Sequence, residues 1–142
     1  MKTKKLCRFS VAMNGDLVSQ LDEMTKDNGY ASRSQAIATS VRNSLVEHYG
    51  HMGKHEIAGT VTLVYDHHKR NIQALLTDIQ HDHGNLIIAA MHVHLDHHNC
   101  MEVLAVRGRA DAVKTVADRL IAAKGVKHGR LVVTTTGEEF QK

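Results

Sequence analysis

The 142-residue sequence predicts an α+β protein in two parts, and three observations lead to this prediction. A short alternating segment and two amphipathic stretches fill residues 1–50. Six later segments have the periodicity of strand, helix, strand, strand, helix and strand. Between them, residues 48–55 carry two glycines and no sustained periodicity, which is typical of a hinge. We therefore predict one domain at 1–50, a hinge at 51–56 and a second domain at 57–142.

The first domain is predicted to begin with a strand at 7–12, where apolar and polar residues alternate. Asn14 can cap a first helix that Gly29 ends. Ser32, followed three residues later by Gln35, is the pattern that opens a second helix, which should end near residue 47 or 48. These elements make too small a core to fold alone, and the strand has no partner in its own segment. We therefore predict an obligate dimer that pairs the strands of two chains antiparallel.

The second domain is predicted to be a ferredoxin-like α+β sandwich, in which helices cover one face of an antiparallel sheet. Its strands and helices are expected at 57–65, 69–81, 86–95, 100–106, 110–123 and 128–135. The hydrophobic fraction is 42% and the chain has no Trp, so the sequence predicts a packed core of aliphatic side chains.

Composition and charge exclude several classes of protein. The net charge is only +3, but the N-terminus is a basic arm that contains Lys2, Lys4, Lys5 and Arg8. No apolar stretch follows this arm to make a signal peptide, and no run is long enough to span a membrane. The two cysteines do not suggest an oxidised compartment. With no phosphate loop, nucleophile elbow or carboxylate pair in view, we expect a cytoplasmic protein that is not an enzyme.

Histidine is the outlier in this composition, with 12 residues and no continuous run. His92 and His94 are two positions apart, so both imidazoles project from the same face of a strand. A hairpin brings Cys100 back beside this strand, and Cys100 shares the face of the two histidines only if it pairs directly with His94. In that register Glu102 lies opposite His92 and can accept a hydrogen bond from its imidazole N–H. Two imidazoles and a thiolate suit zinc, copper or nickel. His81, on the preceding helix, is a candidate fourth ligand from the same chain or a neighbouring subunit.

Two other interpretations of the histidines stay open. The His-x-His pair could consist of surface histidines beside a buried structural cysteine, although the nearby His81 and His83 favour a metal site. His67 and His68, beside Asp66, form a weaker cluster. For that cluster an exposed turn between a strand and a helix is favoured over a second metal site.

The polar face of the first strand consists of Arg8, Ser10 and Ala12. A two-stranded ribbon from two chains fits the DNA major groove, where arginine can bond guanine and a hydroxyl can take several partners. An ordinary edge strand with solvated side chains is the alternative. The basic arm and the N-terminus of the second helix, where Arg33 and Ser34 could hold a phosphate, favour DNA.

Beyond these patterns, the chain resembles the nickel-responsive regulator family, NikR, along nearly its whole length. The segments that carry the resemblance are Gly29-Tyr30, Arg33-Ser34, Ala36-Ile37, Val64 to Arg70, His92 to His94, Cys100 with Glu102, Gly125-Val126 and His128-Gly129. The resemblance implies a ribbon-helix-helix domain, an ACT-like regulatory domain and a homotetramer assembled as a dimer of dimers.

The resemblance also implies one square-planar nickel ion per subunit. The matching ligands are His92, His94 and Cys100 of one subunit and His81 of its neighbour. Square-planar geometry with a thiolate favours Ni(II) or Cu(II), whereas zinc prefers a tetrahedron.

The chain departs from the family pattern at two places. Ala12 stands where the ribbon of the family often carries threonine, which leaves the operator sequence open, while Ser10 keeps a hydroxyl. Gln35 and Thr39 stand where some relatives carry acidic residues that help to bind an auxiliary cation.

The predicted function is a DNA-binding transcription regulator that represses nickel-uptake genes when Ni(II) is bound. Because two-fold symmetric ribbons read two half-sites, its expected partner is a palindromic operator. An ACT-type regulator that responds to another metal or a small molecule is one alternative. A metal storage or delivery protein is another, and metal-dependent DNA binding separates both from the main prediction.

Overall fold

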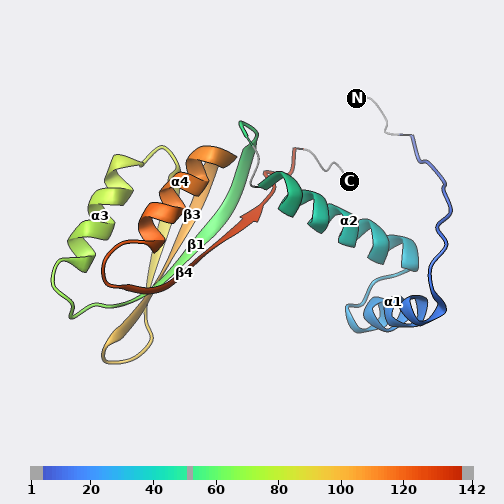
Figure 1. Cartoon of the computed structure of the whole chain (residues 1–142), viewed down its shortest axis with the longest axis horizontal. Coiled ribbons are helices and arrows are strands. Elements are labelled where there is room, and N and C mark those ends of the chain that lie inside the picture. Colours follow the sequence, from blue (N-terminus) through green and yellow to red (C-terminus); the bar gives the residue numbers. More distant parts are fainter. Residues whose placement is uncertain (1–4, 51–52, 139–142) are drawn as a thin grey trace. The chain divides into compact units, whose positions relative to one another are not determined.

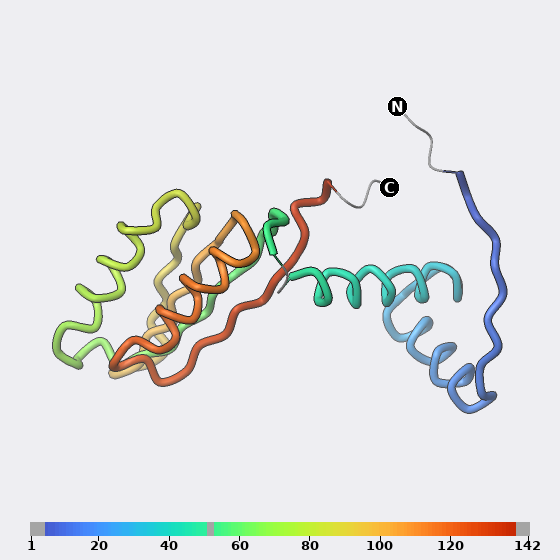
Figure 2. Tube along the Cα trace, turned by 45° about the horizontal axis from the view of Figure 1, so that its top comes forward, coloured from blue at the N-terminus to red at the C-terminus, as the bar shows by residue number. Residues whose placement is uncertain are grey.

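The structure is a computed structural model that describes residues 5–50 and 53–138. The chain divides into two compact units, Met1–Asn43 and Ser44–Lys142, and each has its own secondary structure (Figures 1 and 2). Part of the predicted hinge, residues 51–52, lies outside the described residues, as do Lys2 and Lys4 of the basic arm.

Two predicted helices of the N-terminal region are present. Helix α1 spans Gly15–Asp27, and the Asn14 side chain caps it by accepting a hydrogen bond from the Asp16 N–H at 2.9 Å. Gly29, at a φ of 68°, follows the end of α1 in the left-handed region that favours glycine. Helix α2 spans Arg33–Gly50, and the Ser32 hydroxyl accepts from the Gln35 N–H at 3.2 Å. The capping pattern in the sequence therefore sets both helix starts.

The predicted strand at residues 7–12 is not formed in the single chain. Residues 5–14 are neither helix nor strand, and the side chains of Phe9 and Val11 are exposed. A strand is defined by hydrogen bonds to a neighbour, and the neighbour that we predicted belongs to a second copy of the chain. Because the strand was predicted to pair between two chains, the single chain does not test it, and the ribbon stays a prediction about the dimer.

The second unit contains the predicted ferredoxin-like arrangement. Its elements are β1 (Glu56–Asp66), α3 (Ile72–Asp82), β2 (Ile87–His94), β3 (Asn99–Arg109), α4 (Ala110–Ile121) and β4 (Val126–Thr134). The strands form one sheet in the order β2-β3-β1-β4, and every neighbouring pair is antiparallel. Helices α3 and α4 cover one face of this sheet (Figures 1 and 2). The α+β class and the βαββαβ order are therefore confirmed.

The core of the second unit lies between this sheet face and the two helices. Alternate residues of β1 are buried from Ile57 to Tyr65, as a half-covered strand requires. Leu104 of β3 and Leu120 of α4 are fully buried in the same cluster. β2 is an edge strand, and most of its residues are exposed. The sheet thus has a well-covered centre and an open edge that carries His92 and His94.

Helix α2 ends at Gly50, two to three residues later than the sequence predicted, so the first three residues of the glycine-containing segment 48–55 are helical and the predicted hinge at 51–56 begins directly after the helix. Packing within the second unit explains the difference. Gly50 is buried, and a Cβ atom there would lie 2.6 Å from Cγ1 of Val133 in β4. Leu45, Val46 and Tyr49 line a small pocket between the end of α2 and the sheet. These contacts extend the helix beyond the point at which its sequence pattern fades.

Candidate metal centre

The hairpin of β2 and β3 places the predicted ligands as the parity argument requires. His94 pairs with Cys100, and His92 pairs with Glu102. The turn is held by Asp96, whose carboxylate accepts hydrogen bonds from the backbone N–H groups of His98 and Asn99, both at 2.8 Å. The register that we predicted from the spacing of these residues is therefore confirmed.

One group of possible metal ligands comes together among the described residues, and it consists of His67, His94 and Cys100. Nδ1 of His67 lies 3.1 Å from Sγ of Cys100, and Nδ1 of His94 lies 3.5 Å from the same sulfur. All three ligand atoms lie within 4.8 Å of one another. His67 directly follows β1, and Tyr65 of β1 pairs with Cys100, so the sheet itself brings His67 to the thiol.

The sequence analysis underestimated His67, for which an exposed turn was favoured. That description holds for His68, which is exposed in the turn that Asp66 caps by accepting from the His68 N–H at 2.9 Å. His67 differs because it is partly buried and its ring contacts the cysteine. The sequence did contain a signal for His67, because His67 follows the buried Tyr65 by two positions. Side chains two positions apart point to the same side of an extended chain.

His92 belongs to a second network beside this group. The Tyr65 hydroxyl donates to Oε2 of Glu102 at 3.2 Å and lies 3.3 Å from Nδ1 of His92. Nε2 of Gln80, on α3, donates to Oε1 of Glu102 at 2.8 Å. Glu102 is opposite His92 as predicted, but Tyr65 connects the two side chains. Tyr65 and Gln80 were missed because their contacts join segments that are far apart in the sequence.

His81 lies next to Gln80 near the end of α3 and is exposed. It is not part of the group formed by His67, His94 and Cys100. Its predicted role involves the facing subunit of an assembly, and that role stays a prediction.

Burial sets the protonation of the group before a metal binds. Burial raises the pKa of the Cys100 thiol, and the nearby carboxylates of Asp66 and Asp96 raise it further. Desolvation lowers the pKa of His67, and the imidazoles of His68 and His94 act in the same direction. At neutral pH the cysteine is therefore a thiol beside a neutral imidazole. A cation with affinity for sulfur and nitrogen can replace the thiol proton, so this donor set fits a transition-metal ion.

The predicted DNA-contacting residues have a different setting. Arg8, Ser10 and Ala12 are exposed in the segment that is neither helix nor strand. Arg33, at the start of α2, forms a bidentate ion pair with Asp22 of α1, in which Nε–Oδ1 is 2.6 Å and Nη2–Oδ2 is 2.8 Å. The pair joins the start of α2 to α1, and both side chains are about half exposed.

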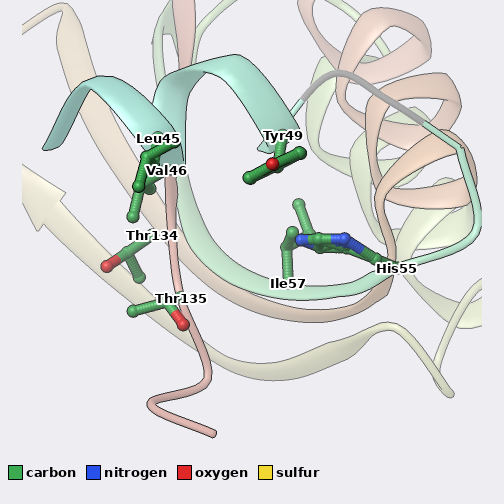
Figure 3. A pocket seen from close by; sticks show the side chains of 7 residues that line it. All are labelled: Leu45, Val46, Tyr49, His55, Ile57, Thr134 and Thr135. Atoms are coloured by element: carbon green, nitrogen blue, oxygen red, sulfur yellow. The ribbon is translucent and has the colours of Figure 1, made fainter. Parts of the chain in front are cut away.

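A small pocket bears on the alternative of a small-molecule effector (Figure 3). It has a volume of about 90 Å³, and its lining includes Leu45, Val46, Tyr49 and Ile57. Ligand sites for small molecules usually have about 300 to 1,000 Å³. This pocket is smaller than that range, and none of the predicted ligands lines it. An open hollow of about 570 Å³ falls within the range, and it is lined by Lys69, Arg70, Asn71, Leu75, Lys124 and Gly125.

The fold and the donor set together define a metal-binding domain of the ferredoxin-like α+β class. The chain belongs to the nickel-responsive regulator family, because the family model of the NikR C-terminal nickel binding domain matches residues 58–134.

Similar proteins extend this match to both units. A protein of Nitratidesulfovibrio vulgaris (strain Miyazaki F) is 50% identical over 133 residues, which cover 94% of this chain and 96% of the relative. A protein of Geobacter sulfurreducens is 53% identical with the same coverage, and one of Pyrococcus furiosus is 44% identical over 95% of this chain and 98% of its own. All three carry the name "Putative nickel-responsive regulator". The family is therefore one of regulators and has a nickel-binding domain.

A solved structure of an uncharacterized protein from Thermotoga maritima shares the fold of part of the chain. The TM-score is 0.51 at 12% identity, and the match covers 57% of this chain and all of the other. At this identity the likeness shows the fold alone. Among the described helices, none is both long and apolar enough to span a membrane.

Proposed function

We propose that this chain is a cytoplasmic transcription regulator that binds operator DNA and represses nickel-uptake genes when Ni(II) is bound. The observation that carries the proposal is the hairpin register, which pairs His94 with Cys100 and His92 with Glu102 in a member of the nickel-responsive regulator family. The proposed nickel ligands are His92, His94 and Cys100 of one subunit and His81 of the facing subunit, with one ion per subunit.

The open edge of the sheet supports a site shared between subunits. His92 and His94 are exposed on the edge strand β2, where a neighbouring chain can reach them. Ile88 and Met91 of the same strand are also exposed, although large apolar side chains of this kind are usually covered. His81 is exposed on α3. We infer that two chains meet along this edge and that the full assembly is a homotetramer.

The contacts of α3 support a route from the metal to the rest of the molecule. Gln80 donates a hydrogen bond to Glu102 of its own subunit. The next residue, His81, is the proposed ligand of the nickel ion that the neighbouring subunit holds. Bound nickel supplies a link between two subunits through this helix. Such a link shifts a conformational equilibrium if nickel binds one arrangement of the subunits better than another, and it raises DNA affinity if DNA prefers that same arrangement. We propose that it favours the arrangement of the DNA-binding units that matches the operator.

The exposed apolar residues of the first unit support a dimeric DNA-binding domain. Phe9, Val11, Leu17 and Val41 are all at least half exposed in the single chain. We propose that two chains cover these side chains by pairing their N-terminal strands into a ribbon. Arg8, Ser10 and Ala12 would then face the major groove of a palindromic operator, and Arg33 and Ser34 would contact a phosphate.

The first test is a Ni(II) titration of the full-length apoprotein followed by absorption spectroscopy. We expect a thiolate-to-nickel charge-transfer band that saturates at one ion per chain and is missing from Cys100→Ala. Selection of operator DNA with and without Ni(II) follows, and nickel should increase the affinity. A band that survives Cys100→Ala would refute the site. Operator affinity that does not respond to nickel would refute the mechanism.

A further inference from the structure

We propose that Lys127 is a positioning residue of the nickel site, which holds the turn between His94 and Cys100 in the shape that keeps these two ligands side by side. It acts through Asn99, whose side-chain oxygen accepts a hydrogen bond from Nζ of Lys127 at 2.6 Å. The part of the proposal that concerns nickel rests on the proposed function. The part that concerns the turn does not depend on the metal.

A β-bulge in β4 directs Lys127 toward this turn. His128 pairs with Val64 and Val126 pairs with Tyr65, so Lys127 is an extra residue on β4 that is paired with none on β1. A bulge of this kind re-aims a side chain and is usually a functional feature of a sheet. Because β1 lies between β4 and β3, the lysine side chain has to cross the end of β1 to reach the hairpin turn. The start of β4 and the hairpin turn lie at the same end of the sheet (Figure 1).

Asn99 connects Lys127 to the turn. Because its Oδ1 accepts from Lys127, its Nδ2 faces the carboxylate of Asp96 and donates to Oδ1 at 3.1 Å and to Oδ2 at 2.9 Å. The same carboxylate accepts from the backbone N–H groups of His98 and Asn99. The carbonyl oxygen of Asn99 accepts from the N–H of Leu95 at 2.9 Å, which closes the turn. Lys127 therefore fixes the direction of the Asn99 amide, and that amide holds the carboxylate on which the turn depends.

The turn matters because it joins two proposed ligands directly. It begins after His94 and ends before Cys100, and these two residues are paired across the hairpin. Nδ1 of His94 lies 3.5 Å from Sγ of Cys100. Ligands that are held in place before the ion arrives bind it more tightly, since less free energy is spent in ordering them. Loosening the turn should therefore weaken metal binding without removing a ligand.

The exposure of Lys127 separates this role from a role in folding. The lysine is exposed and Asn99 is partly buried. Exposed charged side chains contribute little to stability through such contacts, on the order of 0 to 1 kcal/mol. The effect of Lys127 should therefore appear in metal affinity and in the mobility of the turn, whereas the stability of the unit should hardly change.

The test compares two variants of the full-length protein. Lys127→Met keeps the length of the side chain and removes the donor, whereas Lys127→Arg can still donate to Asn99. Residues that contact a ligand typically change metal affinity about 10- to 100-fold, and Lys127 acts from one residue farther away, so Lys127→Met should weaken Ni(II) binding about three- to tenfold in competition with a chelator. The thiolate-to-nickel band should keep its position, because every ligand is present. Lys127→Arg should recover most of the affinity, and the melting temperature of both apoproteins should stay within about 2 °C of the wild type.

Lys124→Met is the matched control. It removes the same charge from the loop that leads into β4, but Lys124 lines the open hollow and should not affect nickel affinity. In an Asn99→Ala background, Lys127→Met should have no further effect, because the connection to the turn is already broken. Nickel affinity that is unchanged in Lys127→Met, or equally weakened in Lys124→Met, would overturn the proposal. So would a loss from Lys127→Met that is as large in the Asn99→Ala background as in the wild type.

Hydrogen exchange of the metal-free protein distinguishes this proposal from the proposed function. Lys127→Met should speed the exchange of the backbone N–H groups in residues 95–99, and Lys124→Met should not. A wild-type protein without a nickel band would refute the proposed function, and the exchange rates would still decide whether Lys127 holds the turn. Equal exchange in Lys127→Met and the wild type would show that it does not.

Discussion

The two units of this chain differ in how they bury apolar side chains. In the second unit, 15 residues form one buried cluster between the sheet and its helices. In the first unit, Ala36 is the one fully buried hydrophobic residue among those described, and helix α1 has no buried residue. Local helix signals are no weaker in the first unit, where Asn14 and Ser32 accept backbone N–H bonds at the two helix starts, whereas neither α3 nor α4 has a side-chain N-cap bond. The difference shows that only the second unit contains enough partners for its own apolar faces.

The most direct way to break this comparison is to separate the units. We expect a fragment of residues 44–142 to unfold cooperatively, because it contains the whole buried cluster. A fragment of residues 1–50 should gain helical structure only as its concentration rises, because folding depends on a second copy. Circular dichroism and sedimentation over a range of concentrations measure both. A monomeric 1–50 fragment that unfolds cooperatively would contradict the comparison.

A pair of core substitutions tests the same difference in the intact chain. Leu104→Ala, at a fully buried position of β3, should lower the free energy of unfolding by about 2 to 5 kcal/mol. Val41→Ala removes a side chain that is 50% exposed in the single chain, so its cost should appear as weaker dimerisation that depends on protein concentration. Urea unfolding at two concentrations separates the effects. Equal, concentration-independent losses would mean that Val41 has its partners within one chain.

Gly59 tests how tightly β1 and β4 are paired. A Cβ atom at this position would collide with the backbone oxygen of Val132, which cannot move away as a side-chain end could. We expect Gly59→Ala to destabilise the second unit by about 1 to 3 kcal/mol. Thr60→Ala is the neighbouring control, since Thr60 is exposed and its change should have little effect. Thermal unfolding of the 44–142 fragment measures both, and equal stability of the two variants would show that the strands can separate at no cost.

A change of pH should affect the two units differently, because nickel affinity depends on Cys100 of the second unit. Burial raises the pKa of the Cys100 thiol, so nickel must displace a proton near neutral pH. Protons compete with the metal, and raising the pH by one unit should therefore tighten binding on the order of tenfold. The helical content of the N-terminal region should not change over the same interval. Competition titrations against a chelator measure the affinity, and a constant dissociation constant would mean that Cys100 is already a thiolate.

The smallest expected effect concerns the cap of α1. Asn14→Ala removes the acceptor of the Asp16 N–H bond and should cost about 1 kcal/mol of stability. In the full-length protein this cost should fall on the first unit, and the nickel charge-transfer band should keep its position and intensity. Asn14→Ser is the conservative variant that should restore most of the stability. A changed nickel spectrum would show that the two units are coupled more tightly than the comparison implies.

Periodicity and capping were enough to predict most elements because they depend on residues close in the sequence. Asn14, Ser32 and the alternation of β1 fixed their elements locally, and the ends were within a few residues of the prediction. The end of α2 was predicted too early, because Gly50 packs on Val133, a residue more than eighty positions away. The strand at 7–12 is absent from the single chain, and its pairing with the strand of a second chain stays a prediction.

For the candidate site, the sequence alone predicted the hairpin register on the condition that His94 and Cys100 share a face. Side chains alternate along a strand, so direct pairing of His94 with Cys100 meets this condition and places Glu102 opposite His92, as the structure has them. Only the tertiary structure brought His67 to the thiol and inserted Tyr65 between His92 and Glu102. Those contacts depend on β1 lying between β3 and β4 in the sheet. Pairing of this kind is decided by long-range packing, which no local pattern of residues specifies.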